Sequence, residues 1–106
     1  MEKSFQEITD ALVGILRIKN KAYGNSFDKT MQKWGMTALG IRLDDKLSRI
    51  NNLVTSNNIS NNGESLLDNL FDLAGYSVLG IRFLLEQDKL TPEDIAKYFN
   101  KGSESD

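Results

Sequence analysis

The chain contains no cysteine and no histidine. Without cysteine it can form no disulfide framework, and it offers no thiolate as a nucleophile or metal ligand. Without histidine it lacks an imidazole for acid–base catalysis or metal binding. Any chemistry would therefore use carboxylates, hydroxyls and amines, and any metal would be a hard, oxygen-binding ion such as Mg²⁺ or Mn²⁺.

Long apolar runs and a basic excess are missing as well. No apolar run approaches the roughly 20 residues of a membrane-spanning helix, and the N-terminus "MEKSFQEITD" lacks the apolar core of a signal peptide. We therefore expect a cytoplasmic protein without a membrane partner. The formal net charge of −2 argues against a general electrostatic attraction to nucleic acid, so direct nucleic-acid binding is not expected.

One proline among 106 residues and apolar residues repeated at helical spacing predict an all-α fold. The length suits one domain, because a single core of this size can be stable without further support. The 40% hydrophobic and 26% charged residues are typical of a globular protein and do not indicate disorder. We expect a single helical domain over 1–101 and a disordered tail over 102–106.

Apolar periodicity and capping signals predict a small bundle of about five helices. The expected helices cover 4–21, 27–34, 37–54, 64–87 and a segment that begins at Pro92. The capping signals are Ser4 with Glu7 at the first helix, Gly35 after the second, and Thr91 before the last. The asparagine-rich stretch 51–63 predicts a loop, because asparagine side chains compete with helical hydrogen bonds.

Three acidic residues of the fourth predicted helix, Glu64, Asp68 and Asp72, repeat at every fourth position. They would form one line of like charges that repel each other, so a compensating charge is expected. Apolar residues surround nearly the whole circumference of this helix, which predicts that it is buried together with its polar residues. Buried carboxylates are either paired with bases or bound to metal. So much apolar surface also exceeds what five short helices can cover, which predicts a homodimer.

The third predicted helix carries Arg42, Asp45, Lys46 and Arg49 within about 100° of one another, next to its apolar face. With Asp45 added to the three acids of the fourth helix, four carboxylates would surround one or two Mg²⁺ or Mn²⁺ ions. The three bases would then hold phosphate oxygens. The alternative is a salt-bridge network between the two helices, without metal.

The connection "KNKAYGNSF" between the first two predicted helices holds more polar groups than a turn needs. In the wall of a nucleotide pocket, Lys19 would reach phosphate, and Asn20 and Ser26 would hydrogen-bond sugar or base. Tyr23 would stack on the base, and Gly24 would let the backbone come close. The alternative is a plain helix connector with Tyr23 packed in the core.

Three motifs in order, "KNKAYGNSF", "RLDDKLSRINNL" and "ESLLDNLFDLAGY", resemble the nucleotide modification associated domain 1 family of phages and Firmicutes. That family is similar to the MazG-like all-α nucleoside triphosphate pyrophosphohydrolases. The resemblance covers 19–85 and implies a MazG-like helical bundle that binds a nucleotide with Mg²⁺ and assembles as a homodimer or homotetramer. If a phage encodes the chain, its location would be the host cytoplasm.

In MazG-like enzymes a Glu-x-x-Glu pair on one helix and a Glu-x-x-Asp pair on the next hold the metal. Here Glu64 with Asp68, or Asp68 with Asp72, corresponds to the second pair at a spacing of four residues instead of three, and Asp45 corresponds to the first pair only in part. The resemblance thus gives these four acids both the catalytic and the metal-binding role. Tyr76 would stack on the base, although an aromatic residue at a helical position is more often part of the core.

Three functions follow as hypotheses. In the first, the protein is a hydrolase in which a Mg²⁺-bound water attacks the α-phosphorus of a nucleoside triphosphate, releasing pyrophosphate and a nucleoside monophosphate. In the second, suggested by the incomplete acidic set, it is a phage protein that sequesters a nucleotide or a nucleotide signal without turnover. In the third, it is a purely structural helical bundle.

Overall fold

The computed structural model describes residues 2–23, 26–56, 60–61, 64–87 and 91–104. Its elements are α1 (Glu2–Tyr23), α2 (Ser26–Trp34), α3 (Met36–Thr55), β1 (Ser60–Asn61), β2 (Glu64–Ser65), α4 (Leu66–Glu86) and α5 (Pro92–Glu104). Five helices account for nearly all of the described residues. The predicted all-α class is therefore confirmed, with a single two-residue antiparallel pair added to it.

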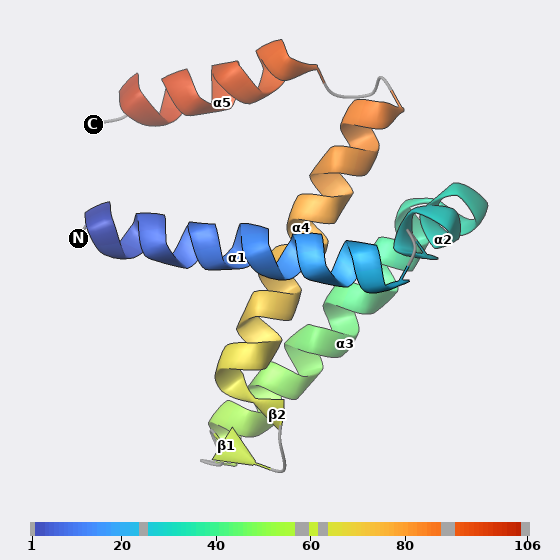
Figure 1. The fold of residues 1–106 in the computed structure, drawn as a ribbon, viewed down its shortest axis with the longest axis vertical. Helices are drawn as coiled ribbons and strands as arrows, with labels where there is room; N and C mark the ends of the chain where they lie inside the picture. The colour runs from blue at the N-terminus through green and yellow to red at the C-terminus, as the bar shows by residue number, and fades with distance from the viewer. Residues whose placement is uncertain (1, 24–25, 57–59, 62–63, 88–90, 105–106) are drawn as a thin grey trace.

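Helices α3 and α4 form the centre of the molecule (Figure 1). They pack against each other more extensively than any other pair of described elements. Helix α1 crosses α4, and α2 contacts both α1 and the beginning of α3. Helix α5 follows the far end of α4 and, in this view, extends toward the side on which the chain begins. No helix among the described residues is long and apolar enough to cross a membrane.

The buried core lies where α2, α3 and the second half of α4 meet. Its buried apolar residues are Met31, Ala38, Leu39 and Phe83, and the half-buried Phe27, Leu43 and Tyr76 pack against them. The two central helices approach closely at Gly80, where an added Cβ would overlap Cδ2 of Leu39. The guanidinium of Arg82 ties α4 to α2 as well, because its Nη2 lies 2.6 Å from Oδ1 of Asp28.

Gly35 separates α2 from α3, as the sequence predicts. Its φ of +68° lies in the left-handed region that glycine adopts without strain. Its N–H donates to the carbonyl of Met31 at 2.7 Å, and its own carbonyl accepts from the N–H of Ala38. The same residue therefore ends one helix and begins the next, which turns the chain sharply at the edge of the core.

The start of α1 and the start of the asparagine-rich loop differ from the prediction. Helix α1 begins at Glu2, so Ser4 lies inside it and is not its cap. Helix α3 continues to Thr55, through the first part of the expected 51–63 loop. There the hydroxyl of Thr55 donates to the carbonyl of Asn51 at 2.7 Å, and that of Ser56 to Asn52 at 2.6 Å. The carbonyl of Asn52 also accepts from the N–H of Ser56 at 3.0 Å, so the helical hydrogen-bond ladder continues through the asparagines and the hydroxyl bonds add to it.

The start of α4 also differs from the prediction, because Glu64 lies before the helix. Glu64 pairs with Asn61, and Ser65 with Ser60, in the short antiparallel β1–β2 pair. Ser65 then caps α4 in a capping box with Asp68, so the helix begins at Leu66. The expected line of three carboxylates along one helix is therefore reduced to two.

Helix α4 is not buried around its whole circumference, which corrects a second expectation for this helix. Four of its apolar residues are exposed: Leu67, Leu70, Val78 and Ile81. At 100° per residue they fall within about 80° of one another, opposite the face that meets α3. The other helices of one chain cover only part of α4, and an apolar stripe remains on its outer side.

The predicted beginning of α5 is confirmed. The hydroxyl of Thr91 accepts from the N–H of Asp94 at 3.2 Å, and the Asp94 carboxylate accepts from the N–H of Thr91 at 2.9 Å. Bonds from the backbone and side chain of Thr91 lower the pKa of Asp94. Helix α5 extends to Glu104 and so includes 102–104, which were expected in a disordered tail, whereas 105–106 lie outside the described residues.

Candidate functional site

A cleft of about 490 Å³ lies among α1, α2, α3 and α4. Its charged residues are Lys19, Arg42, Lys46 and Asp72, and its uncharged polar residues are Asn20, Ser26 and Thr30. Aromatic and aliphatic side chains form the rest of the lining: Phe27, Phe71, Tyr76, Leu12, Ile15, Leu16 and Leu79, with Gly75. A concave apolar surface with a few convergent polar groups is typical of a small-molecule site.

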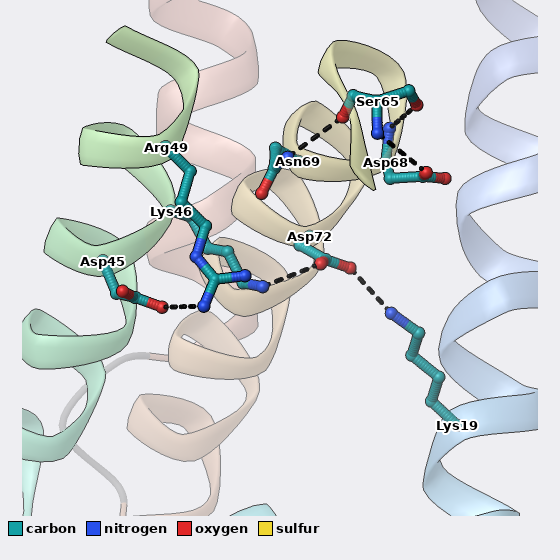
Figure 2. A network of polar contacts seen from close by, with 8 residues as sticks. All are labelled: Lys19, Asp45, Lys46, Arg49, Ser65, Asp68, Asn69 and Asp72. Carbon is teal, nitrogen blue, oxygen red and sulfur yellow. Dashed lines mark hydrogen bonds and ion pairs between the residues drawn. The ribbon is translucent and has the colours of Figure 1, made fainter. Parts of the chain in front are cut away.

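Asp72 lies at the centre of the charged part of this cleft (Figure 2). Its Oδ1 lies 2.7 Å from Nζ of Lys19, and its Oδ2 lies 3.0 Å from Nζ of Lys46. The three residues come from α1, α3 and α4, so the two ion pairs join three helices. The Lys46 and Asp72 side chains are only 15% and 21% exposed, which strengthens their interaction relative to a surface pair.

The two lysines determine the charge state of Asp72. Burial raises the pKa of this carboxyl group, but the hydrogen bonds and positive charges of Lys19 and Lys46 outweigh burial and hold the pKa below its ordinary value. Asp72 is therefore ionised at neutral pH. Together the three groups place two cations around one anion.

Arg42 adds a third cation to the cleft. It precedes Lys46 by one helical turn on α3, so the two side chains leave the same face. Arg42 is exposed and makes no ion pair with any other described residue. The lining thus has three positive charges and one negative charge among its described residues. An excess of two positive charges favours an anion in the cleft.

The aromatic part of the cleft lies beside the cations. The rings of Phe27 on α2 and Tyr76 on α4 have centroids 5.4 Å apart and planes inclined by 49°. Close packing of α1 against α4 supports this wall, because a Cβ on Gly75 would lie 3.3 Å from Cδ2 of Leu16. Aromatic rings that line a cleft offer stacking and edge contacts to a planar ligand.

Two other acids predicted for the site make different contacts. Asp68 accepts from the N–H of Ser65 at 3.2 Å as part of the α4 capping box, although it also lines a small recess next to Asp72. Asp45 lies outside the cleft, with its Oδ2 3.5 Å from Nη2 of Arg49 on the exposed side of α3. Figure 2 shows the separation of Asp45 from Asp72 by the lysine and arginine side chains between them.

The predicted four-carboxylate metal set is not assembled in the described part of the chain. No group of three or more acidic side chains there is close enough to hold an ion. The side chains of Glu64 and Tyr23 are not among those described, and Gly24 lies outside the described residues altogether. The carboxylate at the centre of the cleft is already paired with two ammonium groups. Positive groups at this position suit the binding of an anion better than the binding of Mg²⁺.

Seven of the residues singled out from the sequence line this one cleft: Lys19, Asn20, Ser26, Arg42, Lys46, Asp72 and Tyr76. The sequence reasoning missed Phe27, Thr30 and Phe71. The spacing of Ser26 and Thr30, one helical turn apart, could have indicated a shared polar face on α2. Nothing in the local pattern indicates that this face turns toward α1 and α4, because that depends on packing between helices.

Comparison with protein families, with curated proteins and with solved structures found no match for the chain. Membership of the nucleotide modification associated family therefore stays a prediction from the three motifs. The function has to be argued from the chemistry of the cleft.

Proposed function

We propose that the cleft binds a nucleotide. The observation that carries this proposal is the convergence of three cations, Lys19, Arg42 and Lys46, and one aromatic wall on a single cavity. The cations suit the phosphates of a nucleotide, and the aromatic residues suit its base. Lysine and arginine are the usual phosphate-binding side chains, and arginine can hold two phosphate oxygens at once.

The size and the remaining lining support the same ligand class. A volume of about 490 Å³ lies within the roughly 300–1,000 Å³ that is usual for small-molecule sites. The Phe27 and Tyr76 rings provide a surface of the kind on which bases stack, an interaction of about 1–3 kcal/mol per base. Asn20, Ser26 and Thr30 add amide and hydroxyl groups for the sugar or the base edge.

Binding without turnover fits the described residues better than hydrolysis does. Asp72 is the only described acid that lines the main cleft, and its two oxygens are already paired with Lys19 and Lys46. A metal-dependent hydrolase needs carboxylates with free oxygens around the ion. We therefore favour a nucleotide-binding protein, and pyrophosphate release from a nucleoside triphosphate stays the prediction that competes with it.

A purely structural bundle explains the ion pairs but not the whole site. Such a bundle would pair its charges and fill its interior. Here Arg42 has no ion-pair partner among the described residues, and a cavity remains between four helices. These two features favour a ligand.

We also propose that the protein works as a homodimer. Its Cα radius of gyration of 15.7 Å exceeds the roughly 13 Å of a compact chain of this length. Fifteen large apolar residues among those described expose two fifths or more of their area. They are spread over all five helices, and four of them share the outer stripe of α4. The outer stripe of α4 is the part of this surface best suited to a second copy.

A panel of nucleoside triphosphates tests the proposed function on the purified full chain. Thermal unfolding and pyrophosphate release are measured for each nucleotide, with and without Mg²⁺. A nucleotide-dependent increase in the unfolding temperature without product supports binding. Pyrophosphate release that disappears in Asp72→Asn supports the hydrolase instead. No response to any nucleotide or ion would refute both and leave the structural bundle.

A further inference from the structure

We infer that the Asp72 carboxylate competes with a ligand phosphate for the ammonium groups of Lys19 and Lys46, so that binding exchanges one anionic partner of these lysines for another. This inference rests on nucleotide binding in the cleft. It adds a role for Asp72 that is neither metal binding nor catalysis. Asp72 would be an internal competitor that sets how much negative charge a ligand must carry.

The geometry of the three side chains carries the inference. Each Asp72 oxygen faces one lysine, with Nζ to O distances of 2.7 Å to Lys19 and 3.0 Å to Lys46. Figure 2 shows the carboxylate between the two ammonium groups, which approach from different helices. A tetrahedral phosphate has more acceptor oxygens than a carboxylate and can contact both ammonium groups at once. The arrangement is therefore that of an anion site with a protein carboxylate in it.

The three side chains differ in their freedom to move. Asp72 lies in the middle of α4 on a short side chain, so its carboxylate stays close to the helix. Lys19 and Lys46 have four-carbon stems that can turn their ammonium groups toward an incoming anion. Besides these lysines, the charged residues among those described that line the cleft or the recess beside it are Arg42 on α3 and Asp68, one turn before Asp72 on α4. The exchange thus requires rotation of two flexible side chains and no movement of a helix.

The charge of a ligand should decide how well it competes with Asp72 for the two lysines. A ligand group with a single negative charge only replaces the charge that Asp72 already provides. A phosphate monoester carries nearly two negative charges above pH 7, so it offers the lysines more than Asp72 does. The cleft should therefore prefer a nucleotide with a terminal phosphate monoester to a cyclic nucleotide, whose phosphodiester carries one charge.

The wild-type protein provides the first test. Isothermal titration calorimetry at pH 7.5 compares the 5′-monophosphates of adenosine and cytidine with their 3′,5′-cyclic monophosphates. For at least one of the two bases, we expect the 5′-monophosphate to bind at least about tenfold more tightly than the cyclic monophosphate. Equal affinity for the two forms would contradict the inference while leaving nucleotide binding intact. No binding of any nucleotide would refute the proposed function and the inference together.

The second test removes the competing charge. In Asp72→Asn we expect the 5′-monophosphate and its cyclic form each to bind about tenfold more tightly, because the carboxylate competes with both ligands. The control Asp44→Asn removes the same charge from an exposed residue of α3 that does not line the cleft, and its affinity should stay within about twofold. Circular dichroism checks that each variant is folded. Unchanged or weaker binding by folded Asp72→Asn would overturn the inference.

Discussion

The ammonium group of Lys46 lies 3.0 Å from Oδ2 of Asp72 and joins α3 to α4 at the wall of the cleft. If the cleft binds phosphate, Lys46 contributes a charge-assisted hydrogen bond to the ligand. Lys46→Met should then weaken nucleotide affinity at least tenfold, because such bonds contribute about 1.5–3 kcal/mol. Titration calorimetry measures the change.

Lys97→Met is the matched control for Lys46→Met. Lys97 is an exposed residue of α5 and does not line the cleft, so its variant removes the same charge far from the proposed site. Its nucleotide affinity should equal that of the wild type. Equal losses in the two variants would indicate a general electrostatic effect and count against a specific site.

The stability of the protein should depend on pH through Asp72. Its lysine partners lower its pKa in the folded state below the ordinary value of 3.8, so the folded protein binds this proton less readily than the unfolded chain does. The ion pairs therefore stabilise the fold above pH 3.8, and this contribution is lost as the pH falls through the lowered pKa.

Urea unfolding at a series of pH values measures this contribution. The difference in unfolding free energy between wild type and Asp72→Asn should be largest near neutral pH and shrink below pH 3.8. Asp44→Asn controls for the loss of one carboxylate on the surface. A wild-type advantage that is the same at every pH would show that the ion pairs do not stabilise the fold.

Two glycines test the close packing of α3 against α4. Gly80→Ala should lower the unfolding free energy by about 1–3 kcal/mol, because its Cβ would overlap the buried Leu39 side chain. Gly40→Ala is the control, since a Cβ there meets nothing within 4 Å, and it should stabilise the helix by about 0.5–1 kcal/mol. Effects of the same sign in both variants would contradict the helix contact described here.

The homodimer predicts a molecular mass of twice 11.9 kDa in sedimentation equilibrium. Ile81→Glu places a charge in the outer apolar stripe of α4 and should weaken dimerisation at least tenfold. Gln32→Glu changes an exposed residue of α2 outside this stripe and should leave the dimer intact. A monomer at every concentration would refute the proposed dimer without affecting the cleft.

The helices could be predicted from the sequence because their signals are local. Apolar spacing and capping signals together predict all five, and Gly35 and Thr91 mark boundaries that the structure has. The errors also have local causes. Ser65 with Asp68 makes a capping box, so Glu64 is excluded from α4, and the backbone ladder of α3 continues to a bond from the N–H of Ser56 to the carbonyl of Asn52. These contacts compete with the intrinsic helical propensity of the residues. Which of the two decides a helix end depends on local geometry, which the composition does not show.

The site could be predicted only in part, because it depends on packing between helices. The sequence indicates Arg42 and Lys46 by their positions next to the apolar face of one helix and Lys19 by the polar stretch "KNKAYGNSF", and all three line the cleft. The acids were grouped by their spacing on single helices, but Asp45 turns to Arg49 and Asp68 to the capping box. The arrangement of the helices decides which neighbouring donor or base a carboxylate pairs with.

The central claim is that the cleft among α1, α2, α3 and α4 binds a nucleotide, and a backbone amide NMR titration tests it most directly. Adenosine 5′-triphosphate and cytidine 5′-triphosphate are titrated separately into the ¹⁵N-labelled full chain. We predict that the amide resonances of Asn20, Thr30, Arg42 and Tyr76 shift with a saturating dependence on at least one nucleotide, whereas those of α5 do not. Saturation confined to α5, or no saturating shift with either nucleotide, would contradict the claim.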